Sequence, residues 1–181
     1  MRIISGKYRA KQIIAPSNLP VRPTTDFAKS ALFNILNLHF NFSSVRFLDL
    51  FCGTGNISFE MISRGCEHIV AVDANSQCLN FVRRIAEQEL KCTIKTTRYD
   101  ALRFIKSCKE KYDIIFADPP YKYESREELI NSIFSYELLE KGGVFVLEHP
   151  SGDHYDGIKE FVEKRSYGAV QFSFFKNSIE K

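Results

Sequence analysis

The sequence lacks the features that identify membrane, secreted and metal-binding proteins. Its 181 residues contain no apolar run of about 18 residues, so no transmembrane helix is predicted. The first residues lack the apolar segment of a signal peptide, and we therefore expect a cytoplasmic protein. The five cysteines include no Cys-x-x-Cys pair, and their odd number argues against a disulfide framework. The four histidines show no metal-ligand spacing either, so no metal site is predicted.

Acidic residues are absent from the first 25 positions. These positions carry five basic residues, whereas the whole chain has a net charge of only +3, so the remainder is slightly acidic. Such a basic segment is either a contact for a polyanion or a solvated tail. Three prolines between residues 16 and 23 separate it from the rest, so we expect a small basic β-hairpin extension over 1–23 and a main domain over 24–181. The candidate RNA contacts are Arg2, Lys7, Arg9, Lys11 and Arg22.

Short apolar runs alternate with helix-like segments along the main domain. This alternation predicts an α/β fold with a parallel, doubly wound sheet and helices on both faces. The expected strands are 45–51, 68–73, 93–97, 112–117 and 144–148, followed by a closing hairpin that includes 168–176. The expected helices are 27–38, 56–64, 76–89 with Ser76 as its N-cap, 101–109, 126–134 and 155–164.

The segment Asp118-Pro119-Pro120-Tyr121 follows the apolar strand 112–117. Two prolines cannot continue a central strand, because neither donates a ladder hydrogen bond and each fixes φ. The chain therefore leaves the sheet rigidly at its carboxyl edge, where open α/β sheets bind ligands. A carboxylate and an aromatic ring on such a turn suit a flat group that carries an amine, although a plain turn is the alternative.

A glycine-rich turn and acidic strand ends point to the same edge of the sheet. Gly53 and Gly55 follow Asp49 and open a helix, whose amino end offers unpaired N–H groups and a positive dipole. Ser58 stands where a dinucleotide site has its third glycine, so Gly-x-Gly alone is weak. Asp73, at the next strand end, can accept both hydroxyls of a ribose.

Asp100 follows the third strand. Its carboxylate either caps the next helix or meets the amine of an adenine, and different oxygens allow both. Acidic strand ends around a Gly-x-Gly loop describe a pocket for an adenosine with an amino-acid tail.

With the Asp-Pro-Pro-Tyr turn, residues 47–148 resemble the class I S-adenosylmethionine-dependent methyltransferases that modify exocyclic amines. Residues 1–9, 22–26 and 31–36 carry a closer resemblance within this class. In these segments the chain resembles the bacterial RsmD family, whose members methylate N2 of a guanine in 16S ribosomal RNA. Two segments depart from the family: residues 10–12 are less basic, and Lys29-Ser30 replaces an Arg-Glu pair, so position 29 receives no role.

The resemblance implies a seven-stranded Rossmann-like sheet, S-adenosylmethionine as cofactor and no metal. It also implies a cytoplasmic monomer acting on ribosomal RNA or the small-subunit particle, without membrane contact. Asp118 and the Pro119 carbonyl would accept hydrogen bonds from the target amine, beside Pro120, and Tyr121 would stack on the base. The implied cofactor residues are Thr24, Thr25, Asp26, Asp49, Phe51, Gly53, Gly55, Asp73, Asp100 and Ala101.

Several other functions remain open on the sequence alone. The target amine could belong to another base, such as N6 of adenine in RNA or DNA, although the chain has no room for a separate DNA-recognition domain. Glutamine methyltransferases that act on release factors normally carry Asn where this chain has Asp118. An oxidoreductase would explain Gly-x-Gly and Asp73 but not the Asp-Pro-Pro-Tyr turn. A non-catalytic RNA-binding protein is the third class.

Overall fold

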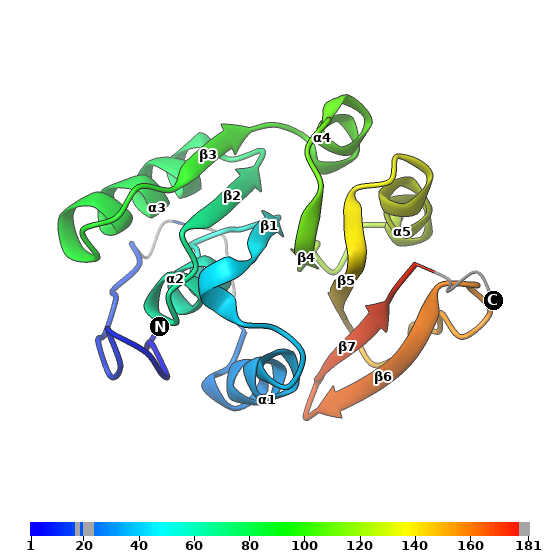
Figure 1. Ribbon diagram of the computed structural model, residues 1–181, viewed down its shortest axis with the longest axis horizontal. Coiled ribbons are helices and arrows are strands. Elements are labelled where there is room, and N and C mark those ends of the chain that lie inside the picture. The colour runs from blue at the N-terminus through cyan, green and yellow to red at the C-terminus, as the bar shows by residue number, and fades with distance from the viewer. Residues whose placement is uncertain (17–18, 20–23, 178–181) are drawn as a thin grey trace.

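The computed structural model describes residues 1–16, 19 and 24–177, and it contains one mixed sheet with helices on both faces (Figure 1). The strands are β1 (Arg46–Leu50), β2 (His68–Asp73), β3 (Lys95–Arg98), β4 (Tyr112–Ala117), β5 (Leu139–His149), β6 (Phe161–Tyr167) and β7 (Val170–Phe175). The helices are α1 (Asp26–Asn37), α2 (Asn56–Ser63), α3 (Ser76–Glu89), α4 (Ala101–Ser107) and α5 (Arg126–Ser135), with a 3-10 turn at Phe42–Ser44. None of these helices is long and apolar enough to cross a membrane.

The sheet order is β3-β2-β1-β4-β5-β7-β6, and β7 is antiparallel to both of its neighbours. This order confirms the seven-stranded, Rossmann-like sheet that the sequence predicts. Chain order reverses between β1 and β4, which are parallel neighbours with Leu50 in register with Ala117. Open α/β sheets bind ligands at such a reversal, beyond the carboxyl ends of the strands. The glycine loop after β1 and the Asp-Pro-Pro-Tyr turn after β4 therefore meet at one place.

The two faces of the sheet carry two separate hydrophobic cores. Side chains alternate along each strand, so Ile114 and Phe116 pack with α1, α2 and α3, whereas Ile115 packs with α4 and α5 on the other face. All three are at most 3% exposed. Burial on both faces explains why the central strands read as continuous apolar runs.

The predicted helix over 155–164 is wrong. Residues 155–160 form turns, and the chain then enters β6, an edge strand paired only with β7. Tyr155, Ile158, Phe161 and Val162 have helical spacing, which misled the prediction. Gly157 weakens a helix in this segment, and the hydrogen-bond ladder with β7 rewards an extended chain instead. Charged side chains at 163–165 are typical of an exposed sheet edge.

Smaller differences concern element ends. The N-cap of α3 is Asn75, not Ser76, because the Asn75 side chain accepts a hydrogen bond from the Gln77 amide. The predicted amino-terminal hairpin is short: an antiparallel bridge between Arg2 and Gln12 is flanked by backbone hydrogen bonds from Ile3 to Lys11 and from Ile13 to Met1. The division at residue 23 stays a prediction, and Arg22 lies outside the described residues.

The amino-terminal segment packs against the main domain as part of its core. Ile3 and Ile13 are 2% and 1% exposed and belong to the cluster that covers α1, α2 and α3. Gly6 touches the end of α2 so closely that a Cβ there would overlap the carbonyl oxygen of Ser63. The Tyr8 hydroxyl reaches the carbonyl of Leu90, just after α3. Figure 1 shows this segment in dark blue beside α2 and α3.

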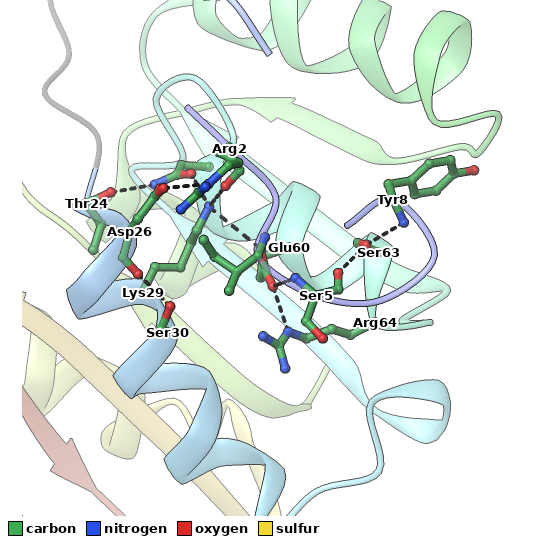
Figure 2. Close-up of polar contacts among 12 residues, drawn as sticks. Arg2, Ser5, Tyr8, Thr24, Asp26, Lys29, Ser30, Glu60, Ser63 and Arg64 are labelled. Atoms are coloured by element: carbon green, nitrogen blue, oxygen red, sulfur yellow. Dashed lines mark hydrogen bonds and ion pairs between the residues drawn. The ribbon is translucent and has the colours of Figure 1, made fainter. Parts of the chain in front are cut away.

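A buried ion pair joins this segment to α1 and α2 (Figure 2). The carboxylate of Glu60 accepts hydrogen bonds from the amides of Ile4 (2.7 Å) and Ser5 (3.0 Å) and pairs with Arg64 at 2.9 Å. The ammonium of Lys29 lies 3.7 Å from the same carboxylate. Both Lys29 and Glu60 are at most 1% exposed.

Lys29 also bonds two oxygens outside the ion pair. Its ammonium donates to the backbone carbonyl of Arg2 (2.6 Å) and to the side-chain oxygen of Asn56 (2.8 Å). Burial lowers the pKa of Lys29, although Glu60 and Asp26 act in the opposite direction. Position 29, which received no role from the sequence, therefore holds the buried cation at the junction of the amino-terminal segment, α1 and α2.

We predict that Lys29→Met lowers the free energy of unfolding by about 3–5 kcal/mol, because it leaves the Glu60 carboxylate buried without this cation. The matched control is Lys106→Met, which removes an exposed ion pair with Glu128 and should change stability by less than about 1 kcal/mol. Urea unfolding followed by circular dichroism measures both. An equal decrease in the free energy of unfolding of both variants would show that the buried ion pair contributes no more to stability than the exposed one.

Candidate active site

A cavity of about 930 Å³ opens at the carboxyl edge of the sheet, and its lining extends from Asp100 before α4 to the turn between β6 and β7. Twelve of the fourteen predicted cofactor and catalytic residues line it. They are Thr24, Thr25, Asp49, Phe51, Gly53, Asp73, Asp100, Ala101, Asp118, Pro119, Pro120 and Tyr121. The other two lie outside the lining: Asp26 pairs with Arg2 at 3.0 Å, and Gly55 faces the packing beneath the loop.

The loop after β1 is held in an uncommon backbone conformation. Phe51 has φ +60°, a left-handed value that costs a non-glycine residue about 1–3 kcal/mol. Its ring packs edge-on against Tyr123, with centroids 5.1 Å apart. Gly55 has φ +78°, and a Cβ there would meet Val82 at 2.9 Å. Gly55 is therefore required for the turn and for the packing of α2 against α3.

Backbone amides orient the two outer carboxylates. Asp73 accepts hydrogen bonds from the amides of Gly53 (2.9 Å) and Asn75 (2.8 Å), one on each oxygen. Asp100 caps α4 by accepting from the amide of Arg103 (3.0 Å). Each oxygen has two lone pairs, so both carboxylates can still accept from a ligand in the cavity. The helix-capping role of Asp100 is confirmed.

Three further carboxylates line the cavity. Asp49 at the end of β1 is buried and accepts a 2.5 Å hydrogen bond from the hydroxyl of Ser58. Burial raises the pKa of Asp49 to about 7. Burial raises the pKa of Glu148 on β5 to about 7 as well. Asp118 is half-buried, and burial together with the charges of Glu148 and Asp49 raises its pKa well above the usual value. The cavity therefore gathers three carboxyl groups whose ionised forms are disfavoured by burial.

Arg126, at the start of α5, fixes the turn after Asp118. Its guanidinium donates to the carbonyls of Pro120 (2.9 Å) and Tyr121 (2.8 Å), and it lies 3.6 Å from the carboxylate of Asp153. This arginine is only 9% exposed, so its two hydrogen bonds hold the turn from the buried side. The ring of Tyr121, by contrast, is 60% exposed at the mouth of the cavity.

Tyr123 brings an unused polar atom to the same wall. Within the described part of the chain, its hydroxyl is buried and has no hydrogen-bond partner. Burial raises the pKa of this hydroxyl to about 12, so it is a neutral donor at physiological pH. A buried donor of this kind favours a ligand that carries a polar atom nearby.

Sequence reasoning missed several residues of the cavity wall. Glu148 ends a predicted strand just as Asp73 does, so the same rule could have found it. Phe27 and Asn56 lie in the first turns of α1 and α2 and belong to no recognisable sequence motif. Tyr123 lies in a loop, and only its burial against Phe51 identifies it.

The four predicted RNA-contact residues that the structure describes, Arg2, Lys7, Arg9 and Lys11, are not among the residues that line the cavity. Lys7 and Arg9 are exposed at the tip of the amino-terminal segment, where the Lys7 amide bonds Ser63 at the far end of α2. That helix has eight residues and is therefore about 12 Å long. Arg2 is paired with Asp26, and Lys11 with Glu89 at 3.1 Å. Two of the four described basic side chains are thus already engaged.

Comparisons with known proteins agree with this geometry. The family described as Conserved hypothetical protein 95 matches residues 1–176. YlbH of Bacillus subtilis (strain 168) is 35% identical over 186 residues, which cover 97% of this chain and 98% of that protein. Ribosomal RNA small subunit methyltransferase D of Escherichia coli (strain K12) is 29% identical over 150 residues, or 79% of this chain and 68% of that protein.

Among solved structures, a hypothetical protein of Thermus thermophilus, TTHA0928, superposes with a TM-score of 0.84 at 26% identity and covers 97% of this chain and 99% of its own. The family match includes the basic segment as well as the main domain. The chain therefore belongs to the family described as Conserved hypothetical protein 95, which is the RsmD family that its motifs resemble.

Proposed function

We propose that this protein transfers a methyl group from S-adenosylmethionine to the N2 amine of a guanine in small-subunit ribosomal RNA. The observation that carries the proposal is the group of three carboxyl side chains, Asp49, Asp118 and Glu148, that line one cavity. Burial raises the pKa of Asp49 and of Glu148 to about 7 and the pKa of Asp118 well above its usual value, so a positive ligand would relieve the cost of ionising them. S-adenosylmethionine brings an ammonium and a sulfonium, whereas the anionic pyrophosphate of NAD would be repelled.

The residues of the cavity fit this cofactor in detail. Asp49 would hold the ammonium, Asp73 the ribose hydroxyls and Asp100 the edge of the adenine. Thr24 and Thr25, which precede α1, would close the pocket beside Phe51 and Ala101. The buried Tyr123 hydroxyl offers a donor to a polar ligand atom. When bound, the cofactor supplies an electrophilic methyl group on its sulfonium.

The substrate assignment rests on the relatives and on the turn after β4. The Escherichia coli relative is named Ribosomal RNA small subunit methyltransferase D, and the name of YlbH assigns it provisionally to the rRNA methyltransferases. An aromatic amine is a poor nucleophile because its lone pair is delocalised into the ring. Asp118 and the Pro119 carbonyl would accept from its N–H bonds and aim the lone pair at the methyl group. Arg126 already engages the carbonyls of Pro120 and Tyr121, which leaves the Pro119 carbonyl for the substrate.

Exposed aromatic rings surround the mouth of the cavity. Tyr121 is 60% exposed and Phe27, on α1, is 70% exposed. Unpaired bases stack on such rings, at about 1–3 kcal/mol per base. The target guanine must leave its helix to reach Asp118, so the rings suit a loop or a flipped nucleotide.

Asp118→Asn tests whether the turn is catalytic. We expect the rate of methyl transfer to ribosomal RNA or small-subunit particles to fall by about 10²-fold or more, because the amide is a weaker acceptor and cannot take a proton. Transfer of labelled methyl groups from S-adenosylmethionine measures this rate. Asp156→Asn, at an exposed aspartate outside the cavity lining, is the matched control. Full activity of Asp118→Asn would remove Asp118 from the mechanism.

The target base is identified by mass spectrometry of ribosomal RNA nucleosides from a strain without this gene. We expect one N2-methylguanosine of the small-subunit RNA to disappear and to return with the wild-type gene, but not with Asp118→Asn. Loss of a methyladenosine instead would refute the guanine assignment. An unchanged set of nucleosides would refute ribosomal RNA as substrate.

The exposed cations of the amino-terminal segment are tested by charge removal, since deletion would remove Ile3 from the core. We expect Lys7→Ala/Arg9→Ala to weaken RNA binding and to reduce the slope of log affinity against log salt by about 1–2, because two phosphate contacts are lost. Affinity for S-adenosylmethionine should not change. Lys109→Ala/Lys141→Ala removes two exposed lysines elsewhere and is the control. The same salt slope in both variants would mean that the segment does not bind RNA.

A further inference from the structure

Two carboxylates occupy neighbouring positions at the carboxyl ends of β4 and β5, with Asp118 just after β4 and Glu148 next to the last residue of β5. The strands are parallel and Ala117 is in register with Leu147, so Asp118 and Glu148 are the next pair along. Both line the cavity. The sequence assigned Asp118 a role but left Glu148 without one.

Glu148 is held in place by a hydroxyl, not by a cation. The side chain of Thr24 donates to its carboxylate at 2.7 Å, and both residues are buried. The carbonyl of Thr24 in turn accepts from the side chain of Asn56 at 2.9 Å, and Asn56 is bonded to Lys29. The position of Glu148 is therefore fixed by a chain of hydrogen bonds that begins at the buried cation.

The charged groups around this pair are mostly negative. Asp49 acts on Asp118 from β1 and raises its pKa, whereas Arg126 acts from α5 and lowers it. The guanidinium of Arg126 is engaged by the turn carbonyls and by Asp153. On the next position of β5, the ring of His149 lies 2.8 Å from the Ser173 hydroxyl and 3.0 Å from the carbonyl of Pro150. Burial lowers the pKa of His149, so it adds no positive charge at neutral pH.

We propose that Asp118 and Glu148 act as one pair that holds a shared proton in the free protein, loses it when a cationic methyl donor binds, and takes one proton from the methylated amine. This inference rests on the proposed function, and it names Glu148 as a second catalytic carboxylate. The charge of Glu148 raises the pKa of Asp118, and two carboxylates that interact strongly titrate as a unit. Burial raises the pKa of Glu148 to about 7, so the pair holds a proton near neutral pH. A positive charge beside the pair lowers both values and expels that proton.

The charge and proton balance closes over one turnover. The amine lone pair forms the new N–C bond, and the electrons of the broken S–C bond return to sulfur, which becomes neutral. The amine is then briefly cationic and acidic, while the cation that kept the pair ionised no longer exists. The pair therefore regains its proton affinity when the amine has a proton to release. One proton moves from the amine nitrogen to a carboxylate oxygen, and no other reactant is needed.

Isothermal titration calorimetry at pH 7, in two buffers with different ionisation enthalpies, counts the protons released on binding. We expect S-adenosylmethionine to release about one proton more per molecule than S-adenosylhomocysteine, because the two ligands differ in charge only at sulfur. Glu148→Gln should abolish most of this difference. Glu148→Asp should keep it, and Asp156→Asn, outside the cavity lining, should leave it unchanged.

The possible outcomes distinguish the proposed cofactor from the proposed proton-sharing pair. Failure of the wild-type protein to bind either ligand would overturn the proposed cofactor. Binding of both ligands with equal proton release would leave the cofactor intact and overturn the proton-sharing pair. This comparison uses only the wild-type protein, so it stands even if Glu148→Gln does not fold. A full proton difference in a folded Glu148→Gln protein would also overturn the role of Glu148.

Discussion

The placement of the amino-terminal segment and of one cavity wall depends on the contacts of the Lys29 ammonium. It is the buried positive charge opposite Glu60, and it ties the backbone of Arg2 to the first residue of α2. Through Asn56 it also fixes the carbonyl of Thr24, whose hydroxyl holds Glu148. One buried cation thus supports both the amino-terminal segment and one wall of the cavity. A buried ion pair is costly to form, and here its geometry also positions the site.

The opposite condition holds inside the cavity, where three carboxyl groups are gathered without full compensation by cations. A structure built only for stability would pair or remove Asp49, Asp118 and Glu148. Their raised pKa values show that burial disfavours their ionised forms. Together with the left-handed Phe51, they place stored free energy at the ligand site, where binding can release it. A framework whose buried charges are paired, beside a site whose carboxyl groups are not, is typical of enzymes.

The sequence predicted the parts of the structure that depend on local pattern. The parallel strands, the glycine turn and the positions of Asp49, Asp73, Asp100 and Asp118 all follow from apolar runs that end in carboxylates. The segment 155–164 was mispredicted because its apolar spacing is helical, while its pairing with β7 is a long-range interaction that local pattern does not contain. Lys29 was missed for a similar reason, because its partners lie in two other segments, Arg2 near the amino terminus and Asn56 and Glu60 in α2. Glu148 could have been predicted, because it ends a predicted apolar strand in the same way as Asp73.

The contacts of Glu60 with Ile4 and Ser5 join residues more than 50 positions apart in sequence. Closing a chain segment of that length costs conformational entropy before any contact is formed. The amino-terminal segment therefore cannot dock until α2 exists to receive it. The order of folding thus delays the assembly of the cavity wall at Thr24 until the segment, α1 and α2 are all present.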